Sequence, residues 1–199
     1  MIDAIRTTRR TVTAAATLLT LSVGTALTAA CVDDDESPFA RFAAFFRFAP
    51  VTSAPKTLMP ALSSPGEWCT VTTSGMSYAF RSATGMTDTF PIVLTPHSGA
   101  ALWIGGLIVG TPTVPEIGST AFAPVCYDIV CPACYEESGI TRGVSITDPA
   151  LGRATCTRCH TVYDLHNSGV VVEGATRPKA PRLYRYRCTY TNDTFVVQN

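Results

Sequence analysis

Hydrophobic and polar residues alternate with a period of two along much of the chain, and this pattern predicts β-strands. Residues 101–110 are instead apolar throughout, which indicates a buried strand, with a bulge at Gly105 and Gly106. No long segment has the 3.6-residue period of a helix. The strands predicted before the last third of the chain cover residues 44–48, 66–75, 77–80, 101–110, 123–130, 143–147 and 153–156.

The last third of the chain has the clearest strand signals. Residues 182–190 alternate and should place Tyr184, Tyr186, Cys188 and Tyr190 on one face. Residues 191–193 are a predicted hairpin turn, after which 194–198 pair back. Residues 175–181 contain prolines and are a predicted loop, because proline cannot lie in a central strand. The predicted fold class is therefore all-β, with small antiparallel sheets or a barrel.

Length and charge limit the number of domains and the kinds of partner that can be expected. The chain has 199 residues, of which 46% are hydrophobic, so it is long enough for one domain with a core. Its 15 basic residues balance its 15 acidic residues, and no basic run with interleaved aromatics occurs. The sequence therefore gives no reason to expect nucleic acid as a partner.

The first thirty residues differ from the rest of the chain. Arg6, Arg9 and Arg10 give a positive start, and residues 11–30 carry no charge. This order predicts a secretory signal peptide over residues 1–30. A membrane-spanning helix is the alternative, because twenty uncharged residues can cross a bilayer, although this Ala- and Thr-rich stretch is only weakly apolar.

The end of this segment, TAAC, resembles a bacterial lipobox, in which the cysteine is lipidated after cleavage. The resemblance implies lipidation of Cys31, and residues 31–43 are then the lipidated cysteine and an acidic tether. The run Asp33–Glu36 resembles the surface-export tag of Bacteroidota lipoproteins, and it would also serve as a solvated tether. We therefore expect an exported protein that is held on the outer membrane or cell surface through its lipid. Disulfides can persist in those compartments.

Four of the eight cysteines form the pattern C-x2-C-x21-C-x2-C, at Cys131, Cys134, Cys156 and Cys159. The middle spacing is just longer than the usual 15–20 residues of such zinc sites. Two facing Cys-x-x-Cys loops supply four thiolates in the tetrahedral arrangement that Zn²⁺ prefers. Thiolates equally hold a single iron or a [2Fe–2S] cluster. Two local disulfides, or unreactive thiols, are the alternatives.

Three further cysteines, Cys69, Cys126 and Cys188, leave at least one unpaired, and their pairing is open. Cys126 and Cys188 lie in strand patterns and are expected to be small buried hydrophobic residues. His160, which follows Cys159, is a possible fifth donor or redox partner, or simply a half-exposed residue near the loop. Among the carboxylates, Asp88 and Asp128 are isolated and are expected at the surface or in turns.

The same segments resemble a known family. CTRCHTVYDLHNSGVVVEGATRPKAPRLYRYRCTYTNDTFVV resembles the second half of a Rieske domain, which has a CPCHGSxFD segment, a turn, a Gly-Pro loop and a closing hairpin. CYDIVCPAC resembles the strand that carries the first Rieske ligand pair, so this resemblance covers residues 123–198. GEWCTV, GGLIVG and CYDIVCPACYEE also resemble Rieske-like lipoproteins of Bacteroidota. The resemblance implies one Rieske-like β domain over residues 44–199, with a metal-binding subdomain at about 126–170.

The chain departs from the Rieske pattern at both histidine ligands. Ala133 stands where the first histidine belongs, and Cys159 stands at the place of the second. His160 takes the place of the motif glycine. Thr161 and Tyr163, which match the hydroxyl positions, are implied to lie beside the metal-bound sulfurs. The resemblance thus implies a degenerate Rieske-like domain, built like a zinc ribbon from two facing loops, in which Zn²⁺ is the simplest occupant.

Three functions remain open at this point. The first is a non-catalytic lipoprotein with a structural metal, most simply zinc, held by four cysteines. The second is an electron-transfer protein with a [2Fe–2S] or mononuclear iron site, and the third is a thiol–disulfide protein. Catalysis has little support, because the sequence contains no G-x-S-x-G, P-loop or H-E-x-x-H motif.

Overall fold

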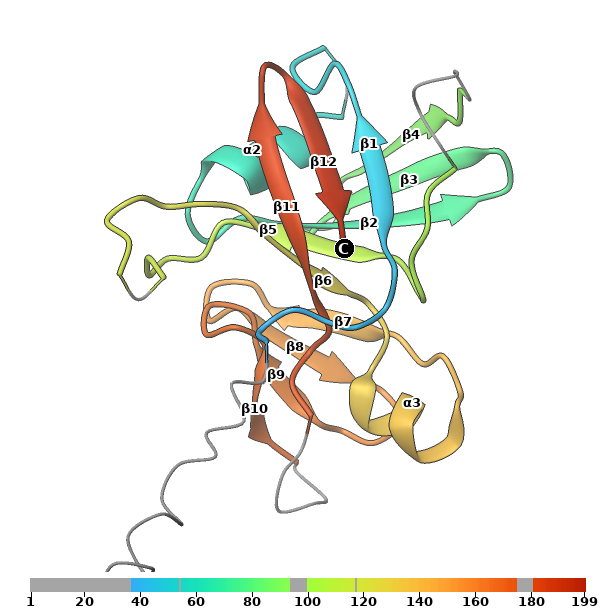
Figure 1. The fold of residues 1–199 in the computed structure, drawn as a ribbon, viewed down its shortest axis with the longest axis vertical. Helices are drawn as coiled ribbons and strands as arrows, with labels where there is room; N and C mark the ends of the chain where they lie inside the picture. The colour runs from blue at the N-terminus through green and yellow to red at the C-terminus, as the bar shows by residue number, and fades with distance from the viewer. Residues whose placement is uncertain (1–36, 54, 94–99, 117, 175–180) are drawn as a thin grey trace, which may run out of the picture. The chain divides into compact units, whose positions relative to one another are not determined.

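The computed structural model describes residues 37–53, 55–93, 100–116, 118–174 and 181–199. Within these residues the strands form two antiparallel sheets (Figure 1). The large sheet has the order β1-β12-β11-β6-β5-β2-β3-β4, and the small sheet has the order β10-β9-β8-β7. The large-sheet strands are β1 (Phe45–Phe48), β2 (Trp68–Ser74), β3 (Ser77–Ser82), β4 (Thr87–Pro91), β5 (Leu107–Gly110), β6 (Val125–Asp128), β11 (Arg185–Thr191) and β12 (Thr194–Gln198).

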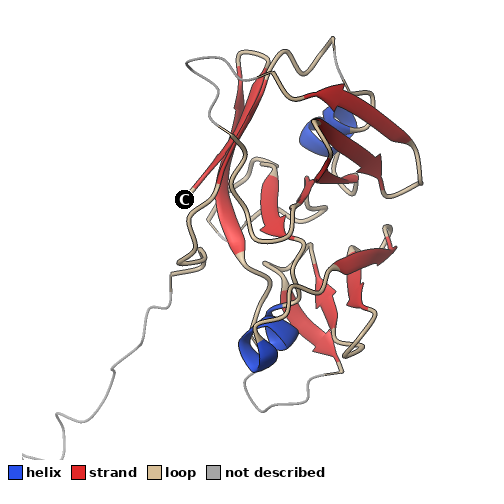
Figure 2. Ribbon diagram, turned by 90° about the vertical axis from the view of Figure 1, so that its right-hand side faces the viewer, coloured by secondary structure: helices blue, strands red, loops and turns tan. Residues whose placement is uncertain are grey.

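The small sheet consists of β7 (Val144–Asp148), β8 (Arg153–Cys156), β9 (Val162–Asp164) and β10 (Val170–Glu173). All four strands lie between β6 and β11 in the sequence, although β6 and β11 are direct neighbours in the large sheet. The small sheet and the helix α3 (Pro132–Ser138) therefore form an insertion between two paired strands. Figure 2 shows this insertion as a layer of its own below the large sheet. The expected all-β class is confirmed.

The central strands of the large sheet are covered on both faces, which explains why their sequences are so apolar. In β5, Leu107 and Val109 face a core with Phe46 of β1 and Phe80 of β3. Ile108 faces the opposite core, which the large sheet shares with the small sheet. Alternate residues of one strand thus enter different cores, as the period of two requires.

A second group of contacts fixes the insertion on the large sheet. Trp68, Val125 and Tyr127 project from β2 and β6 into the core that contains the small sheet. The buried hydroxyl of Tyr127 donates a hydrogen bond of 3.1 Å to the carbonyl oxygen of Leu165, just after β9. Burying the large aromatic side chains Trp68 and Tyr127 contributes to this attachment, since each removes a large apolar area from water.

The closing hairpin forms as the sequence predicts. Strands β11 and β12 pair in the register Thr191↔Thr194. Asn192 and Asp193 both have positive φ, at 49° and 58°, which is the backbone of a two-residue type I′ turn. Asn and Asp tolerate this conformation better than other non-glycine residues. Tyr186 on β11 is buried.

Three parts of the fold differ from the sequence-based expectation. Residues 101–106 are not strand, so the predicted strand 101–110 is reduced to β5. Strand β4 and helix α2 (Leu58–Ser63) have no counterpart among the predicted elements. The first cysteine pair leads into helix α3, which also has no counterpart among the predicted elements. Both helices are too short to give a periodic signal, which needs a window of at least three turns.

The N-terminal region is described only from residue 37. The predicted signal peptide at 1–30, Cys31 and the acidic run lie outside the described residues. Residues 37–43, which belong to the expected tether, contact the large sheet: the Arg187 guanidinium lies 4.4 Å from the Phe39 ring centre, and the Phe42 ring lies 4.9 Å from that of Tyr184. No helix in the described part of the chain is long and apolar enough to cross a membrane.

Candidate metal centre

The first cysteine pair lies where β6 passes into α3. Cys131 is the N-cap residue of the helix, and Pro132 occupies its first position, where a missing N–H has no cost. The Cys131 N–H donates to the carbonyl oxygen of Arg142 at 2.6 Å, and the Tyr135 N–H donates to the carbonyl oxygen of Cys131 at 3.0 Å. These bonds fix the backbone on both sides of Cys131, and the helical turn brings Cys134 back toward it.

The second pair lies in the tight connection between β8 and β9. Cys156 is the last residue of β8, and its N–H donates to the carbonyl oxygen of Thr161 at 3.0 Å. The His160 N–H donates back to the carbonyl oxygen of Cys156, also at 3.0 Å. These two bonds close the Cys-x-x-Cys loop, and they require the left-handed backbone conformation at His160, with φ of 57°.

This conformation gives a prediction for His160. We expect His160→Gly to raise the free energy of unfolding by about 0.5–1 kcal/mol, because glycine adopts positive φ without the Cβ clash. His160→Ala keeps the Cβ and is the matched control, which should not be stabilised. Thermal unfolding of the metal-loaded variants measures the difference. A glycine variant no more stable than the alanine variant would show that this loop is not strained.

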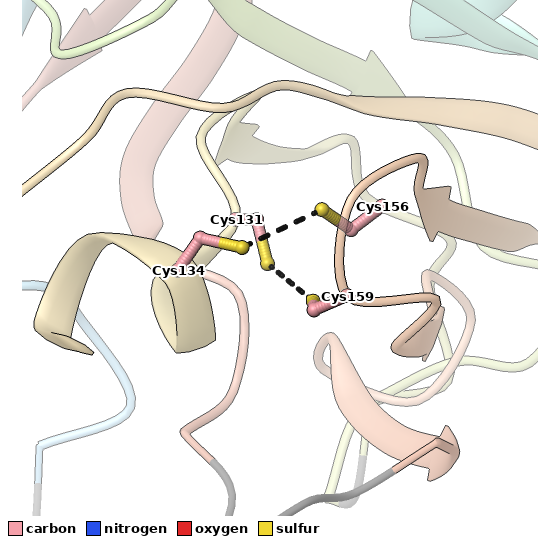
Figure 3. A group of neighbouring side chains, drawn as sticks. All are labelled: Cys131, Cys134, Cys156 and Cys159. Carbon is pink, nitrogen blue, oxygen red and sulfur yellow. Dashed lines mark hydrogen bonds between the residues drawn. The ribbon is translucent and has the colours of Figure 1, made fainter. Parts of the chain in front are cut away.

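The two loops bring their four sulfur atoms together (Figure 3). Cys131 Sγ lies 3.6 Å from Cys159 Sγ, and Cys134 Sγ lies 3.8 Å from Cys156 Sγ. All four sulfurs lie within 4.8 Å of one another. A tetrahedral ion with metal–sulfur bonds of about 2.3 Å requires sulfur separations of about 3.8 Å. The four cysteines are therefore placed to hold one metal ion.

Two hydroxyl groups lie beside these sulfurs. The Thr161 hydroxyl is 3.2 Å from Cys159 Sγ, and the Tyr163 hydroxyl is 3.2 Å from Cys131 Sγ. Both residues are buried, so neither hydroxyl has a shell of water to compete for it. His160 is exposed, and it is not part of the cluster of ligand atoms. The residues next to the sulfurs are thus the threonine and the tyrosine, while the histidine faces solvent.

The cysteines of the site differ in their tendency to ionise. Burial raises the pKa of Cys131 and of Cys134, and neighbouring thiols raise both further. Burial also opposes ionisation of Cys159, but hydrogen bonds from the Thr161 hydroxyl and N–H outweigh it and lower the pKa of Cys159. Without a metal ion, Cys131 and Cys134 therefore hold their protons at neutral pH.

The protonated thiols of Cys131 and Cys134 predict how metal affinity depends on pH. A metal ion bound by four thiolates must displace at least the protons of Cys131 and Cys134, whose pKa values are raised. Each displaced proton weakens zinc binding tenfold for each unit by which the pH falls, so the apparent zinc affinity should rise at least about 100-fold per pH unit between pH 6 and 8. Competition with a chromophoric chelator at several pH values measures this slope. A slope near zero would contradict the assignment of these two cysteines as ligands.

A buried carboxylate supports the start of the first cysteine loop. Asp128, at the end of β6, is fully buried. Its Oδ1 accepts hydrogen bonds from the N–H groups of Val130 and Gly105 at 2.8 and 3.0 Å. Its Oδ2 accepts from the Ile104 N–H at 2.8 Å and from the Tyr186 hydroxyl at 2.9 Å. Burial raises the pKa of Asp128, while these four donors act in the opposite direction.

The expectation that Asp128 is a surface or turn residue is therefore wrong. A signal was available in the sequence, because this aspartate stands alone inside the apolar run 125–130. A carboxylate that is carried into a core needs several hydrogen-bond donors, and these come here from residues 23 to 58 positions away as well as from Val130. Asp88, by contrast, is half-buried and accepts a hydrogen bond of 3.0 Å from the Thr57 N–H.

The remaining described cysteines lie apart from the metal centre. Cys69, Cys126 and Cys188 are free thiols that contribute to the core on the other face of the large sheet. Cys69 and Cys126 are fully buried, and burial raises the pKa of both thiols. The Cys188 thiol lies 3.2 Å from the carbonyl oxygen of Pro124. The burial that the strand patterns predict is confirmed for Cys126, whereas Cys188 is only half-buried.

Comparison of the chain with protein-family models, with curated proteins and with solved structures finds no match.

Proposed function

We propose that this protein is an exported, non-catalytic lipoprotein whose β domain is stabilised by one structural zinc ion, held by Cys131, Cys134, Cys156 and Cys159. The observation that carries the proposal is the convergence of four sulfurs from two separate loops, all within 4.8 Å of one another. One metal ion bound by these four sulfurs would join the two loops, and its binding free energy would add to the stability of the fold.

The spacing of the sulfurs favours a single ion over a [2Fe–2S] cluster. Such a cluster has two irons, each with two thiolates, so the thiolates of different irons lie farther apart than the edge of one tetrahedron. All four sulfurs instead lie within 4.8 Å of one another, so no two of them are spread as far apart as the thiolates of different irons. Zinc is the simplest single ion for four thiolates, because it needs no redox chemistry and no assembly machinery.

The position of the site supports a structural role. Cys131, Cys134 and Cys156 are buried among Tyr163, Leu165 and other apolar side chains of the small-sheet core. A structural zinc has all four positions filled by protein, whereas a catalytic zinc keeps one position for water or substrate. Four converging thiolates in a largely buried site leave no such position. Zinc would connect α3 to the β8–β9 loop and so close the inserted layer.

The family and the cellular location are also proposals. The insertion of the ligand-bearing layer between the paired strands β6 and β11 supports a degenerate Rieske-like domain, in which two facing loops carry the ligands. The lipid on Cys31, the membrane as partner and the location at the outer membrane or cell surface rest on the sequence of residues 1–36. Radiolabelled fatty acid incorporation tests the lipid directly, and a Cys31→Ala variant should lose both the label and membrane association.

Elemental analysis of the as-isolated protein, together with its absorption spectrum, tests the metal. We expect one equivalent of zinc, less than a tenth of an equivalent of iron, and no visible absorption. Chelation under reducing conditions should then release one zinc and expose four additional titratable thiols. A preparation with no metal, in which the thiols are already titratable, would contradict the proposal.

Mononuclear iron in an electron-transfer protein is the second candidate. One observation favours it: Cys159 is only half-buried, so one ligand reaches the surface, where a redox partner could approach. Four thiolates bind iron as well as zinc. One equivalent of iron with strong visible thiolate–iron absorption that bleaches on reduction would identify this function.

A further inference from the structure

The contacts between the two cysteine loops define a specific pairing of thiols. Cys131 Sγ approaches Cys159 Sγ at 3.6 Å, and Cys134 Sγ approaches Cys156 Sγ at 3.8 Å. In Figure 3 both contacts run from the α3 side to the β8–β9 side, and neither joins two cysteines of the same Cys-x-x-Cys segment. These thiols would be left facing each other if the metal ion were removed.

We propose that peroxide converts the metal-free site into two cross-loop disulfides, Cys131–Cys159 and Cys134–Cys156, which hold the loops in place of the metal. The proposal rests on the proposed metal site, because it describes the same four sulfurs after metal loss. The two bonds would join residues that are 28 and 22 positions apart. Such bonds constrain the unfolded chain far more than bonds within a Cys-x-x-Cys segment, and they therefore stabilise the fold more.

The exposure of the cysteines sets the order of the reaction. Cys159 is half-buried, whereas the other three cysteines are buried, so peroxide reaches Cys159 first. The Cys159 sulfur attacks the peroxide O–O bond, takes one oxygen to become a sulfenic acid, and releases one water. The Cys131 sulfur then attacks the Cys159 sulfur, the disulfide forms, and the sulfenic oxygen leaves as a second water.

A second peroxide converts Cys134 and Cys156 in the same way. Four thiols and two hydrogen peroxide molecules thus give two disulfides and four waters. Reduction by a small dithiol, followed by zinc, should restore the metal-bound state. In an oxidising compartment, this chemistry would let the inserted layer survive the loss of its metal ion.

Tryptic peptide mapping of the full chain tests this pairing. Zinc content is measured first on the same preparation, and the metal is then removed with a chelator before two equivalents of hydrogen peroxide are added. Trypsin cuts after Arg158 and so separates Cys156, in peptide 154–158, from Cys159, in peptide 159–179. Cys131 and Cys134 share peptide 82–142, and fragmentation at the Cys131–Pro132 bond separates them in the mass spectrometer.

We expect all three peptides to be joined, with Cys131 linked to peptide 159–179 and Cys134 linked to peptide 154–158. Cys126, in the same long peptide, should remain a free thiol, since it is fully buried in the other core. Bonds within the pairs, the opposite cross-pairing, or sulfinic acids without any bond would each overturn the proposal.

Two serine variants check the pairing independently. Cys131→Ser should keep the link to peptide 154–158 and lose the link to peptide 159–179, and Cys134→Ser should do the reverse. Because the zinc content is measured before chelation, a protein that binds no zinc and a protein that forms the wrong disulfides give separate results. The mapping of the unsubstituted chain stands even if a variant fails to fold.

Discussion

Cys134→Ser is expected to lower the free energy of unfolding of the zinc-loaded protein by about 4 kcal/mol and to reduce its zinc content well below one equivalent. Cys134 is 2% exposed, and it is one of four converging sulfurs. Zinc binding that is coupled to folding contributes about 10–16 kcal/mol in small zinc domains, and a site with three remaining thiolates retains only part of this. A thousandfold loss of affinity corresponds to about 4 kcal/mol. Cys159→Ser should behave in the same direction.

Cys188→Ser is the matched control for this prediction. It makes the same chemical change in a half-buried cysteine outside the cluster, and a serine hydroxyl can still donate to the carbonyl oxygen of Pro124. Its cost should stay below about 1 kcal/mol, with zinc content unchanged. Chemical denaturation and elemental analysis of the three variants give both readouts. If Cys134→Ser and Cys188→Ser unfold alike and bind equal zinc, the metal does not hold this fold.

Asp128→Ala is expected to cost about 4 kcal/mol, although Asp128 touches no ligand atom. Removing the carboxylate leaves the N–H groups of Ile104, Gly105 and Val130 and the hydroxyl of Tyr186 without an acceptor in the described residues. Each buried donor without a partner costs about 1–3 kcal/mol, and water that enters the vacated space recovers part of that cost. Since Val130 directly precedes Cys131, zinc affinity should also fall.

Tyr186→Phe tests the contribution of one of these four hydrogen bonds by itself. This variant removes a single donor to Asp128 and keeps the aromatic ring in the core, so it should cost only about 1 kcal/mol. Urea denaturation of Asp128→Ala, Tyr186→Phe and the parent protein measures both values. A loss for Asp128→Ala as small as that for Tyr186→Phe would mean that the other three hydrogen bonds contribute nothing.

The sequence is sufficient to identify the four cysteines, because their paired spacing is visible without any knowledge of the fold. It predicts the β6 and β11–β12 regions well, because the apolar run at β6, the alternation in β11 and the Asn192–Asp193 turn are local signals. The long spacing between the pairs also has a physical reason. The rest of helix α3, strand β7 and most of strand β8 lie between Cys134 and Cys156, so the chain needs more residues than a bare hairpin to return.

The sequence does not reveal where an apolar run stops being strand. The run 101–110 has uniform hydrophobicity, but the N–H groups of Ile104 and Gly105 bond to the Asp128 side chain and not to a neighbouring strand. That partner is more than twenty positions away. Strand β4 alternates weakly and ends on Pro91, and its pairing with β3 depends on long-range packing. Hydrogen bonds and packing between distant residues therefore determine where the strand in 101–110 begins and why β4 forms, and local sequence patterns do not show either.

X-ray absorption at the zinc edge of the as-isolated protein tests the central claim most directly. If Cys131, Cys134, Cys156 and Cys159 hold one zinc ion, the spectrum will show four sulfur neighbours at about 2.3 Å and no heavy scatterer beyond them. A shell that contains nitrogen or oxygen, or a second metal at short range, would contradict the single-ion tetrathiolate site.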